Sequence, residues 1–181
     1  MSVQNILIEE FVDKKTLSAL DNLLAAADES AIVKNAVLLA DFFGLGEEFK
    51  KIADNKSDEE EKLISSFTKN LVLLIQKTWV EKSDEAMKAQ VLYNLEEFCT
   101  QLGKKHYGEA YVQFFSITED VVYLMFGNQS KSKDFLDYAL RIDPEFGIFW
   151  FYLTSLPKSA DWTENKYRTA LLLAMYFIAN Y

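Results

Sequence analysis

The sequence predicts an all-α protein of antiparallel helical hairpins, and three features of its residue pattern support this fold class. Apolar residues recur at helical spacing along nearly the whole chain of 181 residues. No Asn-Gly or Asp-Gly signal for a β-hairpin separates alternating apolar runs. The chain has only 6 Gly and 2 Pro, so few positions interrupt a helix. About nine helices with short connections are expected, and short connections make neighbouring helices antiparallel.

The N-terminal part of the chain should form three helices and a short helical turn. The three helices are predicted over residues 3–12, 16–27 and 30–44. Ser30 is the expected N-cap of the third helix, because its hydroxyl can accept a backbone N–H of the first turn. Gly44 is its expected end, because glycine readily adopts the left-handed conformation that closes helices.

The most polar stretch of the chain, residues 54–62, is the expected exposed connection. Residues 1–181 otherwise read as a single all-helical domain, and this stretch is the place for a possible subdivision. Within it, Ser57 and Glu60 have the spacing of a capping box, in which each side chain bonds the other residue's backbone N–H.

Two long helices should follow this connection. The first runs to Trp79 and contains residues 71–75, which are apolar on every side and therefore predict a central, buried position. The second begins at an N-cap on Ser83 and ends at Gly103.

The elements become shorter beyond Gly103. Four helices are predicted over residues 107–115, 118–126, 135–142 and 146–153. Asp143 and Pro144 should open the last of these, since proline suits the first position of a helix. Thr163 is the expected N-cap of a final helix that runs to the end of the chain.

One segment carries a repeat-like pattern. Residues 139–144 read Ala-Leu-Arg-Ile-Asp-Pro, Gly127 and Tyr123 precede them, and Trp150 and Leu153 follow. With this pattern, residues 123–153 resemble a tetratricopeptide repeat, a helix-turn-helix unit that stacks into a superhelix. The resemblance implies a binding module whose groove accepts a peptide or a helix.

The sequence around this segment also departs from the tetratricopeptide-repeat pattern. Ser116, Glu119 and Asp120 stand where that family places a bulky pair and a small residue, and Pro157 stands where it places an aromatic. The sequence contains one such repeat boundary and no second Ala-Leu-x-x-Asp-Pro step. An irregular helical bundle therefore remains the alternative architecture.

Residues that commonly perform chemistry are scarce. The chain has one histidine, His106, and one cysteine, Cys99, too few for the usual zinc or di-iron ligand sets. Adjacent carboxylates such as Glu96 and Glu97 diverge by about 100° on a helix and do not converge as a catalytic pair. No phosphate loop, dinucleotide fingerprint or calcium loop is present. The sequence predicts a non-enzymatic protein with no metal and no cofactor.

Aromatic residues are abundant, with 14 Phe, 9 Tyr and 3 Trp. The densest stretch, residues 146–153, is either a helix packed between neighbours or the wall of a groove that binds a partner segment. The predicted partner-binding residues are Phe146, Phe149, Trp150 and Tyr152. The apolar run 170–179 is either a buried closing helix or a dimer surface, so a homodimer is possible.

The chain is acidic, with a formal net charge of −9 and only two arginines, Arg141 and Arg168. This composition disfavours nucleic acid and anionic membranes as partners and favours a protein partner, possibly a basic one. The alternative function is an acidic inhibitor or immunity-type protein that neutralises a basic toxin or enzyme, or mimics nucleic acid. Carboxylates such as Asp58, Asp84, Glu119, Asp120 and Glu145 are also expected in first turns of helices, where the helix dipole stabilises negative charge.

The compartment is predicted from the same composition. A lone cysteine cannot form an internal disulfide, the N-terminal residues lack a signal-peptide pattern, and the longest apolar run is half the length that spans a bilayer. These features predict a soluble, cytoplasmic protein.

Overall fold

The computed structural model describes residues 8–42, 44–54, 57–79, 85–158 and 160–180, and these residues form helices and no strand. The all-α prediction is therefore confirmed. The helices are α2 (Lys14–Ala25), α3 (Glu29–Asp41), α4 (Gly46–Ala53), α5 (Ser57–Trp79), α6 (Glu85–Gly103), α7 (Tyr107–Phe126), the 3₁₀ helix η1 (Gly127–Lys131), α8 (Phe135–Ile142), α9 (Pro144–Ser155) and α10 (Glu164–Ala179). Residues 8–11 are also helical, and the start of the helix predicted over 3–12 lies outside the described residues, as does Ser83.

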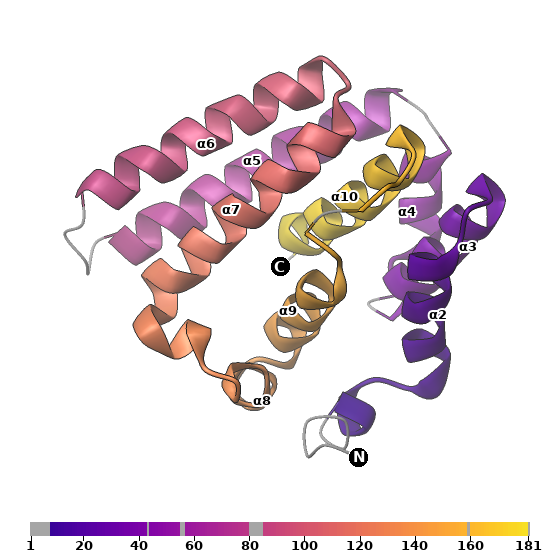
Figure 1. Ribbon diagram of the computed structural model, residues 1–181, viewed down its shortest axis with the longest axis horizontal. Coiled ribbons are helices and arrows are strands. Elements are labelled where there is room, and N and C mark those ends of the chain that lie inside the picture. The colour runs from indigo at the N-terminus through magenta and orange to yellow at the C-terminus, as the bar shows by residue number, and fades with distance from the viewer. Residues whose placement is uncertain (1–7, 43, 55–56, 80–84, 159, 181) are drawn as a thin grey trace.

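The last helix, α10, lies at the centre of the molecule (Figure 1). It packs against α5 and α7 of the antiparallel α5–α7 layer, against α3 and α4, and against α9 of the α8–α9 hairpin. Segments from both sides of the predicted connection at 54–62 therefore meet at α10. A helix that contacts distant segments is typical of a bundle, because the units of a repeat array contact only their neighbours.

The buried position of α10 follows from its sequence. Residues 170–177 are apolar and all buried, so the run 170–179 is a buried closing helix within this chain.

The first turns of the same helix carry charged residues that bond to the ends of other helices. The carboxylate of Glu164 accepts the backbone N–H of Tyr107 at the start of α7 (2.9 Å). Lys166 Nζ donates to the carbonyls of Leu24 and Ala26 at the end of α2 (2.7 and 2.6 Å). Each charge has the sign that stabilises the helix end it contacts.

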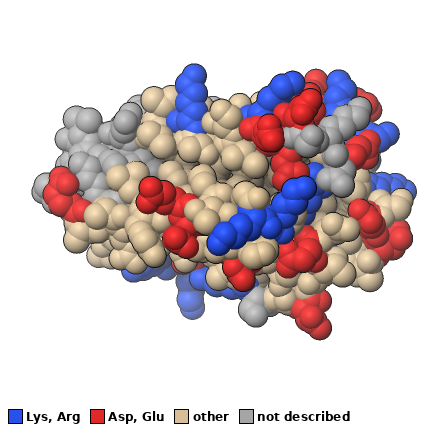
Figure 2. Space-filling view, turned by 90° about the horizontal axis from the view of Figure 1, so that it is seen from above, with Lys and Arg blue, Asp and Glu red and all other residues tan. Residues whose placement is uncertain are grey.

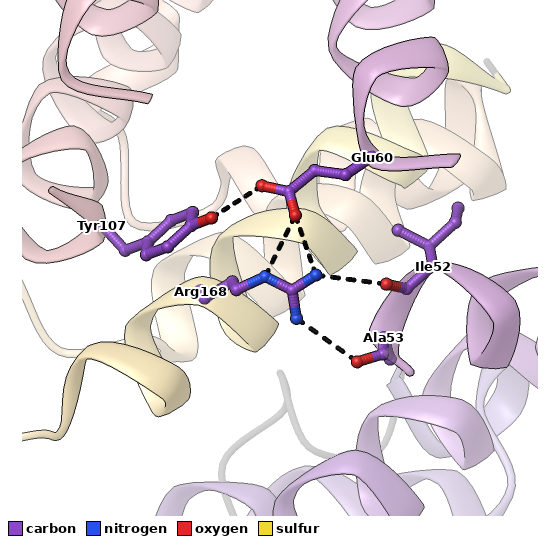
Figure 3. A network of polar contacts seen from close by, with 5 residues as sticks. All are labelled: Ile52, Ala53, Glu60, Tyr107 and Arg168. Atoms are coloured by element: carbon purple, nitrogen blue, oxygen red, sulfur yellow. Dashed lines mark hydrogen bonds and ion pairs between the residues drawn. The ribbon is translucent and has the colours of Figure 1, made fainter. Parts of the chain in front are cut away.

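Arg168 joins α10 to the α4 end and to α5 (Figure 3). Its guanidinium donates to Glu60 Oε2 from Nη2 and Nε (2.8 and 3.2 Å) and to the carbonyls of Ile52 and Ala53 (3.2 and 3.3 Å). The Tyr107 hydroxyl donates to the other oxygen of Glu60 (2.8 Å). The side chains of Arg168 and Glu60 are only 8% and 14% exposed. A buried pair of this kind is tolerated because every charged group has partners.

Burial and the adjacent Glu60 carboxylate raise the pKa of Tyr107 to about 12. An unfolded tyrosine has a pKa of about 10, so the unfolded state loses this proton first. The stability that the protonated Tyr107 contributes is complete below pH 10 and is lost as the pH rises through 12. We expect Tyr107→Phe to cost about 1.5 kcal/mol at neutral pH, because a hydrogen bond to a charged group is lost.

The measurement is urea unfolding of both proteins across this pH range. We expect the free energy of unfolding of the wild type to fall more steeply from pH 10 to about pH 12 than that of Tyr107→Phe. Burial also raises the pKa of Tyr111 and Tyr152 and lowers that of Lys166, but both proteins share these groups. If the free energy of unfolding fell equally steeply with pH in the two proteins, the buried hydrogen bond from the Tyr107 hydroxyl to Glu60 would be contradicted.

Several helix boundaries differ from the predictions. The helices predicted over 107–115 and 118–126 are one continuous helix, α7. Thr118 was expected near a helix start, but its hydroxyl donates back to the carbonyl of Phe114 (2.7 Å), so the buried side chain is satisfied within the helix. The N-cap of α3 is Asp28 and not Ser30, because the Asp28 carboxylate accepts the N–H of Ala31 (3.0 Å).

The predicted exposed connection at 54–62 is also partly wrong. Helix α5 already begins at Ser57, and the two carboxylate oxygens of Glu60 accept hydrogen bonds from Arg168 and Tyr107. In the run 71–75, Leu71 is buried, but Leu73 is 53% exposed, so this run is not central on every side. Two local predictions are confirmed: the side chains of Asp143 and Thr163 cap α9 and α10.

Candidate functional site

An apolar cavity of about 120 Å³ lies where α5, α7, α9 and α10 meet. Its walls come from segments that are far apart in the sequence, and α10 brings them together. The lining residues are Leu45, Leu71, Leu74, Thr118, Val121, Val122, Met125, Glu145, Phe146, Phe149, Phe177, Ile178 and Asn180.

Helix periodicity explains how two of the walls form. Val121, Val122 and Met125 lie within about one turn of α7 and therefore share one face with Thr118 one turn earlier. The hydroxyl of Thr118 is already bonded within the helix, so it adds no free polar group to the cavity. Phe146 and Phe149 are three residues apart on α9 and present both rings to the same space.

The cavity opens to the surface beside Glu145 and Asn180. These two lining residues are exposed, while the others are buried or half-buried. Glu145 lies in the first turn of α9, and Asn180 is the C-cap of α10, with its amide donating to the carbonyl of Tyr176 (2.9 Å). None of the described lining residues is Lys or Arg. The opening therefore presents one carboxylate and, among the described lining residues, no basic side chain.

No protein-family model, curated protein or solved structure matches this chain. Among the described residues, no helix combines the length and the hydropathy needed to cross a bilayer. Within the same part of the chain, no three His, Cys, Asp or Glu residues gather to hold a metal ion.

The predicted partner-binding residues occupy different positions around α9. Phe146 and Phe149 line the cavity. Trp150 is half-buried and packs on Phe135, with ring centroids 5.6 Å apart. Tyr152 is buried, and its hydroxyl donates to the carbonyl of Ala170 (3.0 Å). Tyr152 therefore joins α9 to α10 through this hydrogen bond, and its side chain is not accessible on the surface.

The walls that α7 and α10 contribute were not predicted from the sequence. The signal for α7 is the spacing of Thr118, Val121, Val122 and Met125, which the expected break after residue 115 obscured. Phe177 carries no local signal, because it belongs to a helix that is apolar on most of its surface.

His106 and Cys99 lie away from this cavity. His106 is exposed at the junction of α6 and α7, as predicted, with Nδ1 3.2 Å from Gln101 Oε1 and 3.7 Å from Glu109 Oε2. Cys99 is half-buried on α6, and burial raises the pKa of its thiol, so it is not an activated nucleophile. Neither residue contributes to the cavity.

Charged residues of both signs are spread over one face of the molecule (Figure 2). On the face shown in Figure 2, lysines lie among the carboxylates instead of bordering one acidic patch. Asp58, Glu85 and Glu145 lie in first turns of helices, as predicted. Glu119 and Asp120 were predicted there but lie within the continuous α7, and burial raises the pKa of Asp120. Asp84 lies outside the described residues.

Proposed function

We propose that this protein is a non-enzymatic interaction module that binds a partner segment by inserting an apolar side chain into the cavity between α5, α7, α9 and α10. The observation that carries the proposal is the cavity itself, since a small apolar space with exposed polar residues at its opening suits a buried anchor. The position of Phe146 and Phe149 in its wall supports the proposal further. The repeat-like segment 123–153 contributes α9 and the end of α7 to the same walls.

We also propose that the module works in the cytoplasm. The chain has a single cysteine and so cannot gain the internal disulfides common in small secreted domains.

The experiment fills the cavity without disturbing the fold. Val121→Phe places a larger apolar side chain in the cavity, and we expect it to leave stability unchanged or raise it by about 1 kcal/mol. Val112→Phe is the matched control, since it makes the same change on the same helix at a position that is 53% exposed. Random peptides displayed on phage are selected on the wild-type protein, and binding of the selected peptides is measured for all three proteins.

We expect the selected peptides to bind the wild type and Val112→Phe equally and to bind Val121→Phe at least about tenfold more weakly, since a hot-spot contact is worth about 2 kcal/mol or more. Selected peptides that bind Val121→Phe as tightly as the wild type would contradict the cavity as the binding site.

A further inference from the structure

The chemistry of the cavity also restricts the group that it can accept. A cavity of roughly 150 Å³ lined by Leu, Ile and Phe accepts benzene in a protein core. The present cavity, at about 120 Å³, is close to that size, and the flexible side chain of Met125 in its wall can adjust to a ring. The volume therefore suits a group of the size of a phenyl ring or a branched aliphatic side chain.

The charge at the opening of the cavity determines which charged group can lie next to the inserted side chain. Glu145 is exposed, and no ion pair between it and the described residues is formed. The last turn of α10 ends at Asn180, which also lines the cavity, and the Ala179 carbonyl there accepts a hydrogen bond from the Asn70 side-chain amide (2.6 Å).

No lysine or arginine is among the described residues that line the cavity. Lys51 and Lys62 line a separate depression that also contains Asn180, and Glu48 and Glu59 in the same depression offset their charges. The partial positive charge at the N-terminus of α9 and the partial negative charge at the C-terminus of α10 oppose one another, so the Glu145 carboxylate sets a negative field at the opening. This field has the same sign as the net charge of −9 on the whole chain.

We propose that the cavity binds a partner segment that inserts a phenylalanine or leucine side chain and places a positively charged group, a lysine or arginine or a free amino terminus, beside Glu145. This inference rests on the proposed function and specifies the chemistry of the partner. The apolar cavity provides the affinity, and the carboxylate at the opening selects for charge.

Two small probes of matched size test this selection, phenethylammonium and phenylacetate. Their dissociation constants are measured by titration, followed in the amide NMR signals of Val121, Val122, Phe146 and Phe149. We expect phenethylammonium to bind the wild type about tenfold more tightly than phenylacetate, because one carboxylate attracts the first and repels the second. Raising the salt concentration to about 1 M should reduce this ratio, since the opening is exposed.

Glu145→Gln removes the negative charge at the opening and keeps the size of the side chain, so it tests the effect of charge alone. We expect the variant to reduce the ratio to about twofold, the remainder coming from the net charge of −9 on the chain. Val121→Phe should weaken both probes. Equal binding of the two probes to the wild type, tighter binding of phenylacetate, or no binding of either would overturn the inference.

The selection of peptides on phage distinguishes this inference from the proposed function. We expect wild-type selections to enrich Phe or Leu next to Lys or Arg, and Glu145→Gln selections to lose the basic residue. Apolar peptides that Val121→Phe fails to bind but that lack a basic residue would overturn the charge inference and leave the proposed function supported. Peptides that Val121→Phe still binds would contradict both.

Discussion

Arg168→Met should lower the free energy of unfolding by about 3–5 kcal/mol, the largest effect expected for any single substitution in this chain. The variant would leave the Glu60 carboxylate 14% exposed with only the Tyr107 hydroxyl bonded to it, and the carbonyls of Ile52 and Ala53 would lose their donors. A buried charge without its partner is costly because neither water nor a countercharge compensates it.

Urea or thermal unfolding measures this effect, and the only other arginine supplies the control. Arg141 is exposed on α8, so Arg141→Met should change stability by less than about 0.5 kcal/mol. The double variant Arg168→Met/Glu60→Met removes both charges, and we expect it to recover at least about 2 kcal/mol of the loss, because a buried pair replaced by apolar residues is often nearly neutral. If Arg168→Met and Arg141→Met were equally stable, the buried network would not hold α10 in place.

Gly147→Ala should destabilise the protein by about 3 kcal/mol, at the upper end of the range for overpacked cores. A Cβ atom on Gly147 would lie 2.7 Å from both the Cα and the backbone N of Leu140. These are backbone atoms, so a side-chain rotation cannot relieve the contact, and α8 and α9 would have to move apart. Because α9 carries Phe146 and Phe149, the same movement should weaken binding at the cavity.

Gly103→Ala is the control for Gly147→Ala. Gly103 is the last residue of α6, and a Cβ there would meet nothing within 4 Å. We expect this substitution to be neutral or to stabilise the protein by up to about 1 kcal/mol, because alanine favours helix over glycine. Thermal unfolding compares the two variants, and similar stabilities for both would contradict a close approach of α8 and α9 at Gly147.

The features that sequence predicted well depend on local chemistry. Asp143 before Pro144, and Thr163 before an apolar helix, carry their own capping partners within three residues, and both cap helices as predicted. The same local reasoning failed at residues 116–120. Ser116, Thr118 and Asp120 together resemble a helix start, but in the folded protein Thr118 bonds within the helix and α7 continues.

The features that sequence could not predict depend on long-range packing. Glu60 and Arg168 are 108 residues apart, and no local pattern indicates that they pair. The cavity likewise exists only because α10 brings Phe177 against α7 and α9. Phe146 and Phe149 were predicted from their aromatic segment. That segment alone could not show that these two rings line the cavity while Tyr152 does not.

The location of binding tests the account most directly. A peptide selected on the wild-type protein is added to it, and the amide NMR shifts of the whole chain are mapped. The account predicts the largest changes at Val121, Val122, Phe146 and Phe149. Changes concentrated instead at the exposed residues Leu92 and Tyr93 of α6, with the cavity signals unmoved, would contradict it.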